Sequence, residues 1–229
     1  MDRQKNKYYY LKGIKNGMPI CLGYLAVSFT LGITARNAGM TAWQAMLTSL
    51  ACNASAGQYA GFTVIAAGGT YFEMVLMELV ANARYLLMSC SLSQKFSSET
   101  GLLHRLLVGF DVTDEIFGVA VSEPGKLNPF YNYGMMTVAI PGWSLGTFFG
   151  VIMGNILPAN IVSALSVGLY GMFLAIIIPP ARKNKVIAAL VTISMVSSYI
   201  FSRLPVISDI SSGIRTIILT VAIAGIAAI

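Results

Sequence analysis

The chain has 229 residues, of which 56% are hydrophobic and only 10% are charged, and its mean hydropathy is +0.72. Soluble domains carry roughly 25% charged residues, so the composition excludes a soluble globular protein and predicts an all-α polytopic membrane protein. The net charge of +6 does not indicate a nucleic-acid partner, because the basic residues gather in short breaks between apolar runs. The three cysteines lack C-x-x-C spacing and predict neither disulfides nor a zinc site.

Motifs for enzyme chemistry are missing from the sequence. It contains no G-x-x-x-x-G-K-[ST] phosphate loop and no strand-G-x-G-x-x-G-helix unit. His104 is the single histidine, so the sequence offers no pair of histidine ligands for a metal. We therefore expect neither an enzyme nor a bound metal or cofactor.

Basic residues at the start of the chain predict a cytoplasmic N-terminus over residues 1–15. The first apolar run, about residues 18–35, comes next, and further apolar runs follow it. That succession favours a first transmembrane span over a cleaved signal peptide. We expect residues 16–229 to form one transmembrane domain that crosses the plasma membrane several times.

Later apolar runs predict the remaining spans, because a bilayer needs about 20 mostly apolar residues per helix. In chain order they lie at residues 41–67, 71–92, 135–153, 161–178, 186–201 and 207–229, with a polar loop at 93–100 and a turn at 155–160. Together with the ambiguous segment 102–121, these runs predict seven to eight transmembrane helices.

Residues 102–121 carry too many charges for a lipid-facing helix and predict either a broken span or a re-entrant element. Counting spans favours a crossing, because the basic break at residues 182–185 returns to the cytoplasm only if an even number of spans precedes it. The prediction is then eight crossings, which places Lys95 and Arg105 on the outer side.

Glycines at positions 142, 146, 150 and 154 recur every fourth residue and predict a bare helix stripe on which another helix packs closely. A comparison of the two parts of the chain at an offset of 118 pairs Gly32 with Gly150 and Met18 with Met136. This keeps open an arrangement of two weakly related halves.

The first of three polar groups at membrane depth lies between residues 53 and 59. Ser55 and Gly57 are small enough to let a helix open or a ligand reach the backbone, and Gln58 offers both a donor and an acceptor. These residues either form part of a substrate site or simply join helices by hydrogen bonds.

The second polar group follows one helix face, because Glu78, Asn82 and Tyr85 are spaced by four and three residues. Arg84 lies beside Tyr85 and offers two parallel donors, which suit the carboxylate of an amino acid. The alternative is that Arg84 only neutralises an acidic residue such as Glu78 or Asp114.

The third polar group consists of Asp111, Asp114 and Glu115, whose spacing predicts one helix face. Neighbouring carboxylates in a low dielectric can carry a proton, which would couple transport to a proton gradient. The alternative is a segment end in the headgroup region, where such residues are solvated.

At these residues the sequence resembles the AzlC family, the large membrane subunit of branched-chain amino acid transport systems. Three stretches carry the resemblance, in the family's order and spacing: the small-residue run Asn53–Tyr59, the [ND]-x-R-[HY] element Asn82–Tyr85 and the T-D-E-[IV]-F element Thr113–Phe117. The resemblance spans nearly the whole chain, and Asp111 lies outside the shared element.

The resemblance implies an exporter of branched-chain or related amino acids that works beside AzlD, a small hydrophobic membrane subunit. It carries over Gln58, Asn82, Arg84, Asp114 and Glu115 as candidate site residues. The residues alone leave two other classes open, a passive channel lined by glycine-rich spans and a non-transporting assembly subunit.

Overall fold

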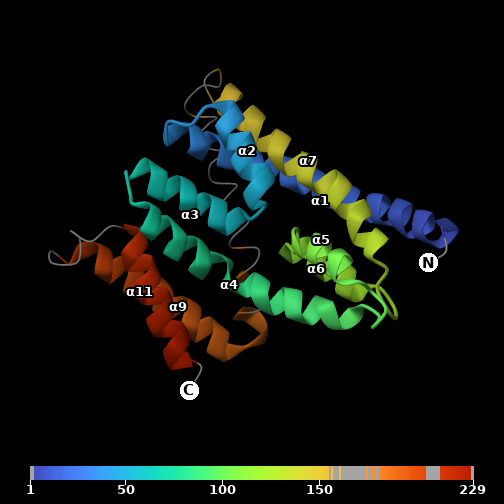
Figure 1. Ribbon diagram of the computed structural model, residues 1–229. Coiled ribbons are helices and arrows are strands. Elements are labelled where there is room, and N and C mark those ends of the chain that lie inside the picture. The colour runs from blue at the N-terminus through green and yellow to red at the C-terminus, as the bar shows by residue number, and fades with distance from the viewer. Residues whose placement is uncertain are drawn as a thin grey trace.

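The structure is a computed structural model that describes residues 3–154, 181–204 and 212–227 and the single residues 156, 160, 174, 177 and 178. Its described part is built from helices and contains no strand, which confirms the all-α prediction. The helices that are long and apolar enough to cross a membrane are α1 (Arg3–Asn37), α4 (Tyr71–Lys95), α7 (Pro129–Met153) and α9 (Lys185–Arg203). Figure 1 shows their arrangement.

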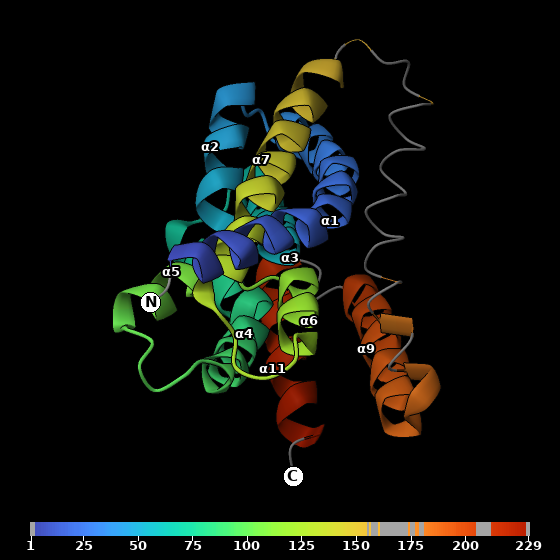
Figure 2. The ribbon, with the colours of Figure 1, turned by 90° about the vertical axis from the view of Figure 1, so that its right-hand side faces the viewer.

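Helices α1 and α7 lie side by side and run in the same direction (Figures 1 and 2). The predicted glycine stripe makes this contact. A Cβ atom on Gly146 would lie 2.6 Å from the carbonyl oxygen of Leu25, and one on Gly150 would collide with the carbonyl oxygen of Phe29. Gly32 and Gly150, which the offset of 118 pairs, face each other directly. The prediction of two halves stays a prediction, because residues 161–173 of the second part lie outside the described residues.

The apolar run 41–67 forms two half-helices, α2 (Ala42–Cys52) and α3 (Ser55–Ala66), where the sequence predicts one span. A capping box of Thr41 and Gln44 starts α2. Asn53 ends it in the left-handed conformation, with φ of 46°, which asparagine tolerates better than most residues. We call residues 53–54 the first break.

Residues 102–121 are also interrupted, as the sequence predicts. They form α5 (Leu102–Gly109) and α6 (Asp114–Ser122), and we call residues 110–113 the second break. The start of α5 and the end of α6, which are the ends away from the second break, lie at the C-terminal end of α4. Arg105 Nη1 donates to the Ser93 carbonyl over 2.9 Å, and Lys95 Nζ donates to the Glu123 carbonyl over 2.7 Å.

This geometry makes α5 and α6 a re-entrant pair, so the prediction that residues 102–121 cross the membrane is wrong. The physical reason is that the carbonyls at helix ends need donors. Arg105, at the start of α5, donates to a carbonyl near the end of α4, and Lys95, at the end of α4, donates to the carbonyl of the residue that follows α6. Lys95 and Arg105 therefore lie at the same end of the molecule as the start of α1, not at the opposite end.

An even number of spans before residues 182–185 does not require that crossing. Helices α1, α4 and α7 give three crossings, and the apolar run 161–178 supplies the fourth if it spans as its sequence predicts. That run and the predicted turn at 155–160 lie almost entirely outside the described residues.

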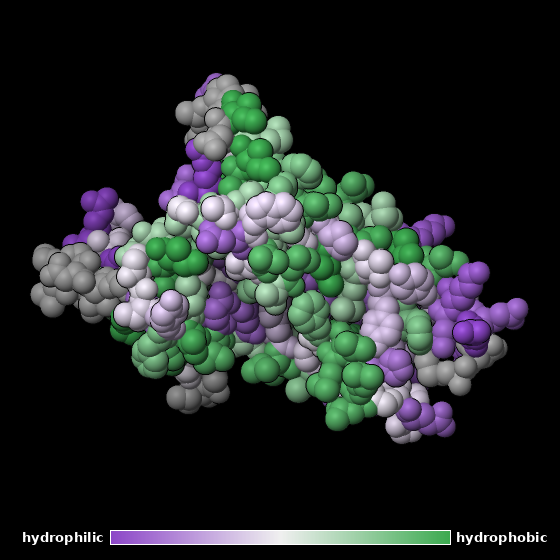
Figure 3. Space-filling view, turned by 45° about the horizontal axis from the view of Figure 1, so that its top comes forward, coloured by the Kyte–Doolittle hydropathy of each residue, from purple (hydrophilic) through white to green (hydrophobic). Residues whose placement is uncertain are grey.

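The last two described helices pair with each other, and the second of them packs on α4. Helix α9 agrees with the predicted span 186–201, and α11 (Ser212–Ala227) packs against both α9 and α4. Large apolar side chains such as Phe72 and Leu87 are 73% and 75% exposed. Figure 3 shows hydrophobic residues over much of this face and hydrophilic ones mainly toward its two ends, which is the pattern of a protein embedded in lipid.

Candidate functional site

The two helix breaks meet inside the molecule. Asn53 Nδ2 donates a hydrogen bond to Asp111 Oδ1 over 2.8 Å, and both residues are buried. Non-helical backbone at membrane depth is tolerated only where it is buried in protein or lines a water-filled cavity. The meeting point of the breaks is therefore where a binding site is expected.

Two small cavities flank this contact. The first, of about 10 Å³, is lined by residues of the breaks together with Tyr24, Tyr85 and Trp143. The second, of about 50 Å³, lies on the side of Cys52 and Phe110. The first has room for about one water molecule, so the structure is a closed conformation in which a larger ligand needs the breaks to move apart.

Helices α1 and α7 contribute two aromatic side chains to the first cavity. The Tyr24 hydroxyl lies 2.5 Å from Thr113 Oγ1 and 2.8 Å from Glu115 Oε2. Its ring packs edge-on against Trp143, with the ring centroids 5.2 Å apart. Sequence analysis missed Tyr24 and Trp143, because a single polar atom on an aromatic ring does not stand out in an apolar run.

Arg84 pairs with Asp114 at the rim of the first cavity, with 2.9 Å between Nη2 and Oδ2. The two side chains are 33% and 31% exposed, so the pair is reachable. The guanidinium also lies over the Tyr85 ring, 5.1 Å from its centroid, and its Nε is buried without a partner among the described residues. In this conformation Arg84 neutralises Asp114, which is one of the two alternatives that the sequence left open.

The polar face of α4 is divided between two neighbours. Asn82 Nδ2 donates to Glu78 Oε2 over 2.7 Å, and this pair packs on α3, where a Cβ atom on Gly57 would lie 2.5 Å from each of them. Tyr85 lines both cavities. Gly57 is thus placed at a helix contact, and Ser55 is placed at the first cavity.

Gln58 lies in a closed hydrogen-bond network that joins three helices. Its Oε1 accepts from Trp143 Nε1 over 2.8 Å, and its Nε2 donates to Ser49 Oγ. Ser49 in turn hydrogen-bonds to Thr147 over 2.7 Å. Gln58 is only 1% exposed, so it holds Trp143 in place at the cavity instead of lining the cavity itself.

The three acidic residues are separated by the second break, so the prediction that they share one helix face is wrong. The i, i+3, i+4 spacing places residues on one face only if the helix is continuous, and α6 begins at Asp114. Asp111 bonds Asn53, Asp114 pairs with Arg84, and Glu115 bonds Tyr24. Asp114 and Glu115 lie in the first turn of α6, where negative charge is favourable.

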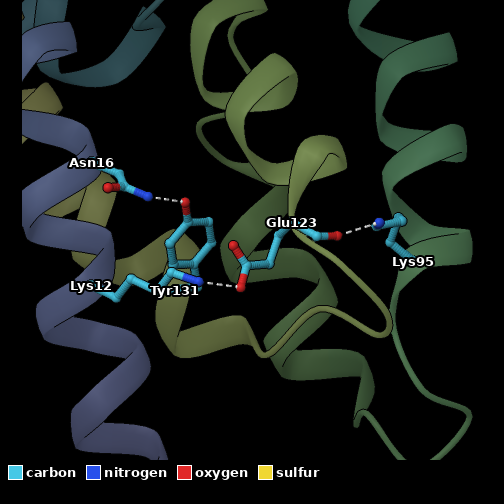
Figure 4. A network of polar contacts seen from close by, with 5 residues as sticks. All are labelled: Lys12, Asn16, Lys95, Glu123 and Tyr131. Carbon is cyan, nitrogen blue, oxygen red and sulfur yellow. Dashed lines mark hydrogen bonds and ion pairs between the residues drawn. The ribbon is translucent and has the colours of Figure 1, made fainter.

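A polar network ties the end of α6 to α1 and α4 (Figure 4). Lys12 Nζ lies 2.5 Å from Glu123 Oε1, and Lys95 donates to the Glu123 carbonyl. Beside them, Asn16 Nδ2 donates to the Tyr131 hydroxyl over 2.6 Å. The two contacts of Glu123 fix the end of α6 that lies away from the second break.

Metal ligands are not grouped in the part of the chain that the structure describes: no three or more His, Cys, Asp or Glu side chains lie close enough to hold an ion there.

Residues 19–157 match the family model described as AzlC protein, a range that runs from the middle of α1 past the end of α7 and includes both helix breaks. An uncharacterized membrane protein of Archaeoglobus fulgidus is 30% identical over 182 residues, which are 79% of this chain and 80% of that protein. The inner membrane protein YgaZ of Escherichia coli is 25% identical over 150 residues, 64% of this chain and 61% of that protein. An uncharacterized membrane protein of Helicobacter pylori is 25% identical over 153 residues, 64% of this chain and 66% of that protein. No solved structure matches the chain.

Proposed function

The chain belongs to the AzlC family of membrane proteins, and from this premise we propose that it is a carrier that exports branched-chain or related amino acids. The observation that carries the proposal is the Arg84–Asp114 pair, which lies at a cavity where two helix breaks meet. Discontinuous helices near the middle of the membrane form the substrate sites of many secondary transporters.

The chemistry of the cavity suits an amino acid zwitterion. The carboxylate of the substrate replaces Asp114 on the guanidinium of Arg84, which can donate two parallel hydrogen bonds to it. The released Asp114 then accepts the ammonium group of the substrate. The aromatic rings of Tyr24, Tyr85 and Trp143 offer an apolar wall for a branched side chain.

The closed cavity is consistent with a carrier. At about 10 Å³ it is far too small for leucine, so binding requires the breaks to separate and access to alternate. A passive channel needs a continuous path instead and does not exchange its solute against solute on the other side.

Counterflow of labelled leucine in proteoliposomes tests the proposal, with Arg84→Lys, Arg84→Ala and the double variant Arg84→Ala with Asp114→Ala compared with wild type. If Arg84 binds the carboxylate, Arg84→Lys reaches the membrane but loses most leucine binding, because lysine offers only a point charge. Removal of Asp114 does not rescue Arg84→Ala in that case. Arg203→Lys, which changes an exposed arginine that does not line either cavity, serves as the control with wild-type exchange.

Near-normal leucine affinity in Arg84→Lys would contradict carboxylate recognition by this residue. Rescue of Arg84→Ala by the loss of Asp114 would assign the pair to charge neutralisation alone. Leucine efflux without counterflow would identify a channel.

The proposal includes two further parts. Asp111, Asp114 and Glu115 are the candidates for ion coupling, and a small hydrophobic AzlD-like subunit accompanies the chain in the plasma membrane, with the N-terminus cytoplasmic. Both parts rest on the family and on the polar site. Co-purification from native membranes tests the partner: recovery of the chain free of any small membrane protein would count against it.

A further inference from the structure

The contact between the two helix breaks leaves two oxygens without a donor. Asn53 Nδ2 donates to Asp111 Oδ1, whereas Asn53 Oδ1 and Asp111 Oδ2 have no hydrogen-bond partner among the described residues. The two residues are only 5% and 2% exposed. Unpaired acceptors are costly in a low-dielectric interior, and an unpaired carboxylate charge costs more still. The contact therefore lacks one donor.

A single proton supplies that donor. A protonated carboxyl carries one O–H donor, and the oxygen of an amide accepts it. The acid and the amide would then be joined by two hydrogen bonds, one in each direction. A hard metal cation fits less well, because it takes about six oxygen ligands, and only two side-chain oxygens are unpaired at this contact among the described residues.

Resting on the proposed carrier function, we propose that Asp111 is the proton site of the carrier and that its protonated carboxyl, donating to Asn53 Oδ1, holds the two helix breaks together. Loss of the proton to water leaves a carboxylate next to an amide oxygen. One of the two links is then broken and the two acceptors repel each other. Because the breaks close the cavity, deprotonation of Asp111 and opening of the site are coupled.

The surrounding charges favour Asp111 over its acidic neighbours as the proton carrier. Asp114 has a cationic partner in Arg84, and Glu115 accepts from the Tyr24 hydroxyl. Asp111 has neither, and Glu115 is close enough to oppose a second negative charge. The ionisable groups that face the contact are Tyr24 from α1, Cys52 from α2, Arg84 and Tyr85 from α4, and Asp114 and Glu115 from α6.

Infrared spectroscopy of the purified chain in lipid nanodiscs measures this proton directly, because a protonated carboxyl and a carboxylate absorb at different frequencies. We expect wild type to show a buried protonated carboxyl at neutral pH and to lose it as the pH rises. Asp111→Asn lacks this band. Asp114→Asn, the matched control in the same segment, retains it, because Asp114 is paired with Arg84 and does not hold the proton.

Leucine counterflow at a series of pH values provides the second measurement. An asparagine at position 111 can accept from Asn53 Nδ2 and donate to Asn53 Oδ1, so Asp111→Asn imitates the protonated contact and is expected to fold. Because this variant keeps the breaks joined at every pH, its exchange should be slower than that of wild type and should lose the pH dependence of wild type.

Persistence of the protonated band in Asp111→Asn would overturn the assignment. A band or an exchange rate that responds to sodium instead of pH would also overturn it and assign the contact to a metal cation. The infrared measurement needs no amino acid, so it tests the proton site independently of transport. An absence of counterflow with every amino acid would contradict only the proposed function, whereas the infrared band alone confirms or overturns the proton site.

Discussion

Gln58 is a polar residue that the family resemblance assigns to the substrate site and that the structure places in a network between helices. Its amide accepts from Trp143 and donates to Ser49. Gln58→Ala would leave the buried indole N–H without an acceptor, which costs about 1–3 kcal/mol. We therefore expect a lower melting temperature in detergent and weaker leucine binding, since Trp143 loses its fixed position.

Gln94→Ala is the control for this prediction, because Gln94 is exposed on α4 and its substitution should leave the melting temperature unchanged. A Gln58→Ala variant as stable as wild type, with lost leucine binding, would instead make Gln58 a direct substrate ligand.

Individual site residues differ in how well the sequence reveals them. Arg84 and Asp114 stand out because charges inside apolar runs are rare and need partners. Tyr24 carries no such signal, although its hydroxyl lies between Thr113 and Glu115. The sequence spacing does not predict that Asp111 and Asp114 have separate partners. The spacing places them on one face only in a continuous helix, and the second break interrupts the helix before Asp114.

At the scale of elements, glycine positions decide how closely α1 and α7 approach. Gly150 touches the backbone of α1, so the methyl group of Gly150→Ala must push the helices apart. Overpacking of this kind costs about 1–3 kcal/mol, and we expect a lower melting temperature. Gly118→Ala is the matched control, because Gly118 is helical with open space around it, and alanine there should stabilise by up to about 1 kcal/mol. Equal effects of the two substitutions would contradict the close contact.

Apolar runs locate the helices but not their interruptions. The run 41–67 is long enough for one span, and the first break contains neither glycine nor proline, so nothing in the local sequence requires it. The break depends on tertiary partners, chiefly the bond from Asn53 to Asp111 on a distant element. Helix α1 is longer than the predicted span instead of interrupted. It begins among the basic N-terminal residues, whereas the sequence predicts a span only from about residue 18.

For the whole molecule, two pairs of short helices lie between the three long helices α1, α4 and α7, which are long and apolar enough to cross a membrane. The pair α2–α3 follows the end of α1 and leads into the start of α4, and the pair α5–α6 follows the end of α4 and leads into the start of α7 (Figure 1). The inner ends of the two pairs meet at Asn53 and Asp111. In the proposed carrier, entry of the pairs from opposite ends would give each side of the membrane one element that opens the site, as alternating access requires.

This arrangement predicts which loops face the same side of the membrane. Lys12 and Lys95 both contact Glu123, so the loop after α4 lies with the start of α1, and the loop before α4 lies at the far end. In a cysteine-free background, Lys5→Cys and Ser98→Cys should react with a membrane-impermeant maleimide from one side of the membrane, and Ala67→Cys should react from the other. If residues 41–67 and 102–121 each crossed as single spans, Ser98→Cys would react from the side opposite to Lys5→Cys and Ala67→Cys from the same side. Labelling in intact cells and in inverted vesicles therefore distinguishes the two topologies, because Ser98→Cys and Ala67→Cys each react from opposite sides in the two cases.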